Sequence, residues 1–235
     1  MLKKILYFNC SPITSGATRS LFYLIKNLDR SQFQPYLVQT YPIFDGISVL
    51  YKSINVKCHF IPTDQIWDGP WIAKRNIQSR ALLTFRTNEK IVSLINRFNP
   101  DLIHVNDYSA VTASITAHRH GIPLVWHCRY PIKTSFFRTG YLLKILYEKL
   151  SDKIITISEP EFSIFKTKKK HMIYNPFELE LKEIEKSKVI RKYLKIDEKC
   201  ILITAPISIG VKHKGAEEFI KSIYLIKKIN PNISM

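Results

Sequence analysis

The chain has 235 residues, of which 46% are hydrophobic and 23% are charged. This composition is that of an ordinary folded domain and excludes a disordered or fibrous chain, and no uncharged apolar stretch is long enough for a membrane-spanning helix. Lysine and arginine total 36 against 19 acidic residues, a net charge of +17, which points to an anionic partner such as a phosphorylated substrate, a membrane surface or nucleic acid.

In chain order, the hydrophobic pattern predicts a strand at 4–9 and a helix through 21–28, then strands at 36–40 and 56–61. It continues with a helix at 81–98, a strand at 102–105, a helix at 109–120 and a strand at 124–128. A helix at 136–150 and strands at 153–157 and 172–174 complete the series. This alternation predicts an α/β fold with a Rossmann-like parallel sheet and helices on both faces.

The alternation restarts near the end of the chain, which indicates a second domain. A strand is expected at 200–204, a helix at 216–228 and a further strand from Ile233. We therefore expect a first domain at 1–178, a linker at 179–198 and the start of a second α/β domain at 199–235. One strand and one helix cannot bury their own apolar faces, so we expect this second domain to be incomplete.

The cysteine pattern and the start of the chain bear on its location. Cys10, Cys58, Cys128 and Cys200 lie in or beside apolar runs and form no CxxC pair, so we expect buried free thiols and a reducing compartment. The basic start is followed by an apolar run at 5–8 that is too short for a signal peptide. We expect a cytoplasmic protein, and peripheral attachment to the inner face of the plasma membrane stays open.

Parallel sheets bind ligands beyond the carboxyl ends of their strands. The segments to inspect are therefore 9–19, 106–109, 127–131, 158–161 and 175–178. The first contains SGATR at 15–19, small residues between a strand and a helix that would let backbone amides approach an anion. It is neither a G-x-G-x-x-G nor a Walker motif, and a plain β–α turn is an equal alternative.

Five segments together resemble a known family. They are SGATR at 15–19, DLIHVN at 101–106, GIPLV at 121–125, DKIITISE at 152–159 and IYNP at 173–176. In their order and spacing over about residues 1–178, the chain resembles the family-4 glycosyltransferases of the GT-B type.

The resemblance implies a two-domain enzyme with its active site in the cleft, in which the first domain holds the acceptor and the second grips a nucleotide-sugar. It implies metal-independent, retaining transfer to a lipid-linked or polysaccharide acceptor, with the nucleotide-sugar as co-substrate and no cofactor or metal. The substrate-binding residues that we expect are Gly16, Ala17, Arg19, Asn106, Asp107, Ser158, Glu159 and Asn175. For Asp107, capping of the following helix is the commoner use.

The chain departs from the family pattern at two places. Where the family often has a histidine after the GIP strand, this chain has Arg129, and alternation places His127 on the same face of the strand. Both are candidate catalytic residues: Arg129 can bind a phosphate or carboxylate, and His127 is either a base or a packed histidine. In the second domain, residues 205–207 (API) replace Gly-Arg-Leu, and Lys212 and Lys214 are the candidate donor-phosphate ligands.

Several alternatives stay open. His104 is as much a core candidate as a ligand candidate. The helix at 136–150 suits either a membrane surface or, as we favour, the core with a solvated basic face, and the lysines at 166–170 are interpreted as a solvated loop. A non-catalytic fragment that binds acceptor or membrane is the alternative function. No zinc-finger, RRM or helix-turn-helix pattern accompanies the positive charge, so we do not expect a nucleic-acid partner.

Overall fold

The computed structural model describes residues 1–11, 15–40, 46–61, 77–107, 110–129, 132, 139–176, 190–197, 199–205, 215–230 and 233–234. The chain divides into two compact units, Met1–Phe177 and Glu178–Met235. The first contains a seven-stranded sheet and the second a two-stranded sheet.

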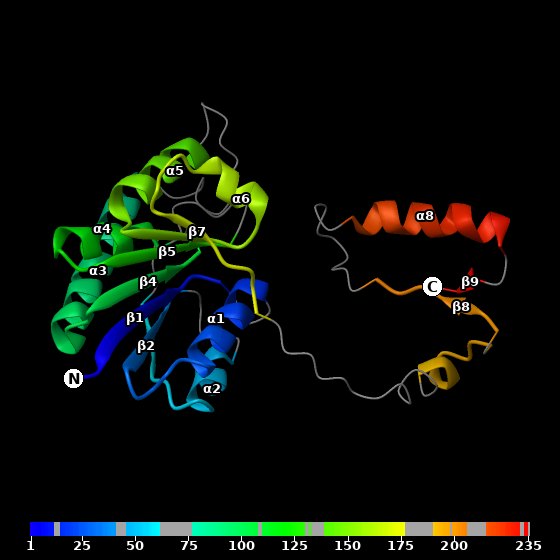
Figure 1. The fold of residues 1–235 in the computed structure, drawn as a ribbon, viewed down its shortest axis with the longest axis horizontal. Coiled ribbons are helices and arrows are strands. Elements are labelled where there is room, and N and C mark those ends of the chain that lie inside the picture. Colours follow the sequence, from blue (N-terminus) through cyan, green and yellow to red (C-terminus); the bar gives the residue numbers. More distant parts are fainter. Residues whose placement is uncertain are drawn as a thin grey trace. The chain divides into compact units, whose positions relative to one another are not determined.

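The first unit is a parallel sheet with helices on both faces (Figure 1). Its strands run in the order β3-β2-β1-β4-β5-β6-β7, and every neighbouring pair is parallel. This confirms the predicted Rossmann-like α/β architecture. The elements are β1 (Lys3–Asn9), α1 (Gly16–Lys26), β2 (Phe33–Gln39), α2 (Ile47–Lys52), β3 (Cys58–Phe60), α3 (Ile77–Phe98), β4 (Leu102–Asn106), α4 (Val111–Arg119), β5 (Leu124–Cys128), α5 (Thr139–Leu150), β6 (Lys153–Thr156), α6 (Glu159–Ile164) and β7 (Lys170–Met172).

The apolar run in β1 shows why this sheet is covered on both sides. Successive strand residues point to opposite faces, and all four residues from Ile5 to Phe8 are buried. Ile5 and Tyr7 join a cluster with α1 and α2, whereas Leu6 and Phe8 join the larger cluster with α3, α4 and α5. A continuous apolar strand is therefore what a doubly covered parallel sheet requires.

Helix α4 ends as the sequence predicts. Gly121 adopts a left-handed conformation with φ of 64°, its N–H donates to His118 O, and the N–H of Ile122 donates to Ala117 O. The second of these bonds is the long bond of a Schellman cap, and it leads the chain directly into β5.

The favoured interpretation of the helix at 136–150 is confirmed for its described part, α5. Leu143 and Tyr147 are buried in the larger core cluster, and the Tyr147 ring stacks on Trp126 with 3.7 Å between centroids. Lys144 forms an ion pair with Glu148 at 2.8 Å, with the two side chains only 14% and 22% exposed, whereas Lys149 is exposed. The apolar stripe of α5 thus serves the core.

Two predictions about the region after α5 are wrong. Strand β7 begins at Lys170, two residues earlier than predicted, and Ile173 and Tyr174 are exposed. The lysines are not merely solvated: Lys169 Nζ donates to Glu148 O and Ser151 O, and Lys170 Nζ donates to Phe162 O and Phe165 O. They satisfy carbonyl groups at the carboxyl ends of α5 and α6, where helices leave acceptors unpaired and favour positive charge.

No disulfide joins the four cysteines, each of which lies among the described residues, and only Cys10 and Cys128 are buried. Cys58 and Cys200 are partly exposed, because β3 and β8 are short strands with incomplete cover. Within the described residues, no helix is both long and apolar enough to cross a membrane.

The second unit is a small β–α–β element. Strands β8 (Ile201–Leu202) and β9 (Ile233–Ser234) pair in parallel, and α8 (Ala216–Ile229) connects them, as the pattern predicts. Of the α8 side chains only Ile223 is buried, whereas Ile220, Tyr224 and Leu225 are more than half exposed. By itself this unit leaves most of the apolar side of its helix uncovered.

Candidate functional site at the carboxyl edge of the sheet

Three neighbouring strands end in buried amide side chains. Asn9 of β1, Gln39 of β2 and Asn106 of β4 share one row of the sheet register, and all three are fully buried. Asn9 Nδ2 donates to Gln39 Oε1 at 2.8 Å, and Asn106 Nδ2 donates to Asn9 Oδ1 at 3.1 Å. Buried amides are tolerated only when their hydrogen bonds are made. In this row of three amides, which we call the polar floor, the side chains bond to one another.

Arg129, which follows β5, joins this floor to two other parts of the chain. Its Nε donates to Asn106 Oδ1 at 2.5 Å, and its Nη1 donates to Ser20 Oγ of α1 at 2.7 Å and to Asn175 Oδ1 after β7. Ser20 Oγ also donates to Asn175 Oδ1 at 3.0 Å. We call Ser20, Asn106, Arg129 and Asn175 the arginine cluster.

The Arg129 guanidinium remains charged and partly unused. Its side chain is only 6% exposed, and burial lowers the pKa of Arg129 to about 10, against the opposing effect of the Asp107 carboxylate. It is therefore still a cation at neutral pH. Its Nη2 is buried and has no hydrogen-bond partner among the described residues, and an unsatisfied buried donor of this kind is suited to a ligand oxygen.

The start of α1 lies beside the arginine cluster. Asn106 Nδ2 donates to Ala17 O at 3.3 Å, and Ser15 caps the helix by accepting from Thr18 N at 3.1 Å. The first amides of a helix lack intrahelical partners and favour anions. Among the described residues, a Cβ placed on Gly16 would meet no atom within 4 Å, which leaves room for a ligand on that side of the backbone. Arg19, in the same turn, is exposed.

His127 lies on the α1 side of the sheet, as alternation predicts for both His127 and Arg129. Its ring centroid lies 5.5 Å from that of His104, which in turn lies 5.1 Å from the Tyr7 ring. Burial, and secondarily the charge of Arg129, lowers the pKa of His127 well below its ordinary range and that of His104 to about 3. Both histidines are neutral at physiological pH. Within the described residues, neither nitrogen of His127 has a hydrogen-bond partner.

Asp107 does not cap α4, so the capping alternative is wrong. Helix α4 begins after Ala110, which makes no side-chain cap bond. Asp107 instead adopts a left-handed φ of 81°, accepts from Ser11 Oγ at 3.3 Å and receives the indole N–H of Trp126 on its carbonyl oxygen at 3.0 Å. Its carboxylate contributes to the field around Arg129.

Ser158 and Glu159 lie at the start of α6. The Ser158 hydroxyl donates to the carboxylate of Glu161, which is buried, and Glu159 is exposed in the first turn. Within the described ranges, no hydrogen bond joins either residue to the arginine cluster. Their proposed contact with substrate stays a prediction.

The other predicted ligands fall outside this geometry. Lys212 and Lys214, the candidate donor-phosphate residues, lie outside the described residues. In the part of the chain that the structure describes, no group of three or more His, Cys, Asp or Glu side chains is arranged to hold a metal ion.

The structure thus brings Ala17, Asn106, Arg129 and Asn175 together at one edge of the sheet, although the roles assigned to them stay predictions. Sequence reasoning missed the polar floor residues Asn9 and Gln39 and the α1 residue Ser20. A signal for Asn9 was present, because it is the one amide of β1 and ends its apolar run, whereas β2 also contains Gln34, so its pattern does not single out Gln39.

These features define an α/β domain of Rossmann type in which buried amides and an arginine gather at the carboxyl ends of the strands. A family model described as Glycosyltransferase Family 4 matches residues 14–181, which is most of the chain and includes every residue of the arginine cluster. The chain belongs to this family.

Solved structures share the fold at low sequence identity. A glycosyltransferase from Rickettsia africae ESF-5 superimposes with a TM-score of 0.64 at 11% identity, covering 99% of this chain and 67% of that one. The UDP-GlcNAc 2-epimerase of Neisseria meningitidis, solved with UDP-GlcNAc, gives 0.56 at 16% identity, with 98% and 64% covered. MurG of Acinetobacter baumannii gives 0.52 at 14% identity, with 76% and 46% covered.

The chain therefore spans between about half and two thirds of these proteins. A search of curated protein sequences found no match.

Proposed function

We infer that this chain supplies the acceptor-side domain of a glycosyltransferase that moves a sugar from a nucleotide-sugar to a lipid-linked or polysaccharide acceptor, with retention of configuration and without a metal. The observation that carries this proposal is the buried Arg129 cation, whose Nη2 has no partner among the described residues, beside the open first turn of α1. Both features favour an anion or a developing negative charge at the carboxyl edge.

The chemistry of glycosyl transfer fits these groups. When the bond from the sugar to the diphosphate breaks, negative charge builds up on the leaving phosphate, and fixed cations or helix amides can stabilise it in place of a metal. In the proposed enzyme, Lys212 and Lys214 hold the donor diphosphate. Arg129 binds an anionic or hydroxyl oxygen of the substrates, and its charge does not depend on pH near neutrality.

His127 has a more restricted role in this proposal. A neutral imidazole can accept a proton from an acceptor hydroxyl, but the ring is only 4% exposed and is held neutral by burial and by Arg129. Its contribution therefore requires that substrate reach the buried side of the carboxyl edge. Substrate binding at Gly16, Ala17, Arg19, Asn106, Asp107, Ser158, Glu159 and Asn175 is part of the same proposal.

Structures with this fold support the choice of a nucleotide-sugar. The solved relatives include an epimerase bound to UDP-GlcNAc and a UDP-glucosyltransferase from Polygonum tinctorium. The net charge of +17 supports a cytoplasmic enzyme that works next to the anionic inner face of the plasma membrane, where each nearby basic residue adds about 1 kcal/mol of attraction.

Transfer and hydrolysis of radiolabelled nucleotide-sugars test the proposal. We expect turnover with at least one donor, and a loss of tenfold or more in Arg129→Gln, because that change removes a charge-assisted contact. Asn175→Ala, at an exposed residue, removes one Arg129 contact with less risk to folding, and Arg119→Gln at the exposed end of α4 is the charge control.

Binding of acceptor or membrane without donor binding or turnover would favour the non-catalytic alternative, in which the chain only holds acceptor or membrane. Co-sedimentation with anionic liposomes would then separate those two ligands. Absence of both binding and turnover, with every donor and with longer proteins that contain this chain, would overturn the proposal.

A further inference from the structure

A second pocket lies at the opposite, amino edge of the same sheet. It is a cavity of about 520 Å³, within the range of small-molecule sites. One end of this pocket is lined by Phe33 at the start of β2, and the other by His59 of β3, which pairs with Val38. The pocket residue Phe98 lies in the core cluster of α3, α4 and α5, whereas the arginine cluster includes Ser20 of α1 on the other face of the sheet. We call this cavity the amino-edge pocket, and it is separate from the arginine cluster.

The amino-edge pocket is strongly basic. Arg30, Lys57 and Arg97 line it, and among the lining residues that the structure describes there is no aspartate or glutamate. Arg30 Nη2 donates to the carbonyl oxygens of Ile25 and Ile54, so part of the hydrogen-bonding capacity of this guanidinium is already used within the protein. Lys57 and Arg97 form no hydrogen bond or ion pair within the described ranges, and Arg97 only lies over the Phe98 ring at 5.5 Å.

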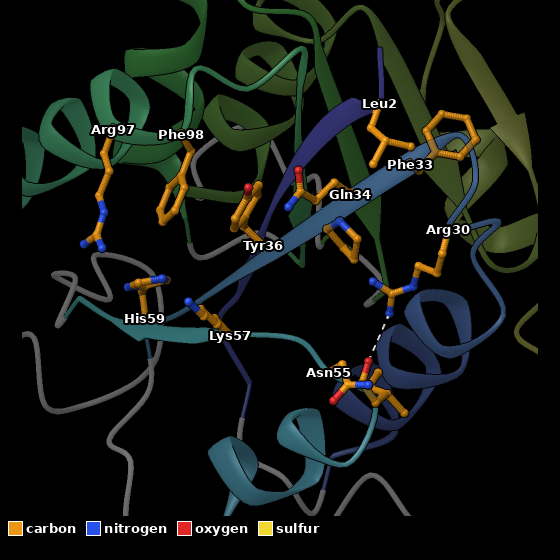
Figure 2. Close-up of a pocket in the computed structure, with 12 residues that line it drawn as sticks. Leu2, Arg30, Phe33, Gln34, Tyr36, Asn55, Lys57, His59, Arg97 and Phe98 are labelled. Carbon is orange, nitrogen blue, oxygen red and sulfur yellow. Dashed lines mark hydrogen bonds between the residues drawn. The ribbon is translucent and has the colours of Figure 1, made fainter.

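A histidine lies between these two free cations in the close-up view. Figure 2 shows Arg97, His59 and Lys57 together at one end of the pocket. Burial and the charges of Arg97 and Lys57 lower the pKa of His59. The Nε2 atom of His59 is buried without a hydrogen-bond partner among the described residues. Two cations therefore lie close to an imidazole nitrogen that can donate in one of its tautomers, and the described lining residues place no carboxylate beside them.

The wall beside these donors is aromatic. The rings of Tyr36 and Phe98 stack with 4.3 Å between centroids, and the His59 ring lies 5.0 Å from that of Phe98. Pro35 occupies β2 at the stretch that β3 does not pair, where its missing N–H leaves no donor to satisfy. The pocket therefore offers a flat apolar surface next to a positive one.

We propose that the amino-edge pocket binds a small organic phosphate, with the phosphoryl group held by Lys57 and Arg97 and a ring placed against Tyr36 and Phe98. A dianionic phosphate matches the charge of the pocket better than a carboxylate does, and the planar guanidinium of Arg97 can bind two of its oxygens. Because of the aromatic wall, we expect a ring-bearing phosphate to bind more tightly than inorganic phosphate.

Titration of the protein with phenyl phosphate, inorganic phosphate and phenol, followed by NMR, tests this site. We expect saturable binding of phenyl phosphate, weaker binding of inorganic phosphate and none of phenol. Amide shifts should change at Tyr36, His59 and Phe98. Shift changes confined to Gly16–Ser20 and Asn175 would assign the phosphate to the carboxyl edge instead and overturn the proposal.

Two double variants separate a built pocket from general attraction to a basic protein. Lys57→Gln with Arg97→Gln should weaken phenyl phosphate binding at least tenfold, whereas Lys149→Gln with Lys168→Gln, which removes the same charge at exposed positions, should leave it unchanged. Equal weakening by both would overturn the proposal. Arg129→Gln should not affect the binding of phenyl phosphate. The test of the amino-edge pocket therefore stays interpretable even if the proposed glycosyl transfer fails.

Discussion

Gly16 occupies the first position of α1, where a glycine lowers helix stability relative to alanine. Nothing in the described part of the fold requires it, because a Cβ at this position would meet no described atom within 4 Å and its φ is not in the left-handed region. Ser15, its neighbour, has a clear structural use as the helix cap. Substitutions at Gly16 and Ser15 can therefore distinguish an effect on ligand binding from an effect on folding.

Gly16→Ala should leave the free energy of unfolding unchanged or raise it by up to about 1 kcal/mol, while nucleotide-sugar or acceptor binding weakens about tenfold because a methyl group enters the ligand's space. Ser15→Ala should do the reverse, with a loss of about 1 kcal/mol of stability from the missing cap. Thermal unfolding and a binding titration on both variants give the comparison. Unchanged binding in Gly16→Ala would remove the first turn of α1 from the proposed site.

The buried histidines predict how stability depends on pH. His104 has a pKa of about 3 in the folded chain, against about 6.5 when unfolded, so the unfolded state binds the proton first as pH falls. Stability is therefore fully present above about pH 6.5 and is lost below it, by up to about 1.4 kcal/mol per pH unit for each such histidine. The carboxylates with lowered pKa values act only at lower pH.

Denaturant unfolding of the parent and of His104→Phe between pH 7 and pH 5 measures this effect. The phenylalanine keeps a ring beside Tyr7 and cannot take up a proton, so its free energy of unfolding should fall less steeply with pH. Parallel curves for the two proteins would show that the burial of His104 does not control acid stability.

At the level of elements, the strands were predictable wherever a run of apolar residues was long enough to be buried on both faces. β1, β4 and β5 appear close to their predicted limits. α2 was missed because its six residues, Ile47–Lys52, follow Gly46 in a left-handed conformation without a side-chain cap, which leaves no sequence signal. β7 was misplaced because Lys170, its first residue, is held by carbonyl groups at the end of α6, a tertiary contact that no local pattern reveals.

The candidate site, too, could be predicted from the sequence only in part. Topology alone placed the strand ends at one edge, and the structure brings Asn106, Arg129 and Asn175 together there. The pairing of Asn9 with Gln39, and of Ser20 with Arg129, depends on sheet register and on the rotation of α1 about its axis. Neither can be read from spacing along the chain.

The hydrogen bonds of Lys169 at the end of α5 give a prediction about the stability of the fold. Lys169→Met keeps the apolar stem but removes the Nζ bonds to Glu148 O and Ser151 O, so unfolding should become easier by up to about 1 kcal/mol. Lys168→Met is the matched control, because Lys168 is exposed and makes no such bond among the described residues. Equal unfolding midpoints for both variants would show that the Lys169 hydrogen bonds do not stabilise the fold.

For the whole molecule, the two units differ in how much of their own apolar surface they bury. The first unit encloses core clusters on both faces of a seven-stranded sheet. In the second, a two-stranded sheet and α8 bury only Ile223 among the described helix residues, and an isolated pair of strands is marginal in water. The first unit should be able to fold alone, and the second should not.

Separate production of residues 1–177 and 178–235 tests this difference. We expect the first fragment to unfold cooperatively at a temperature within a few degrees of the main transition of the whole chain, because its core is self-contained. The second should show no cooperative transition by circular dichroism. A first fragment that lacks fixed packing, with loss of its near-ultraviolet signal, would mean that its core depends on residues after 177, and the independence of the first unit would then have to be abandoned.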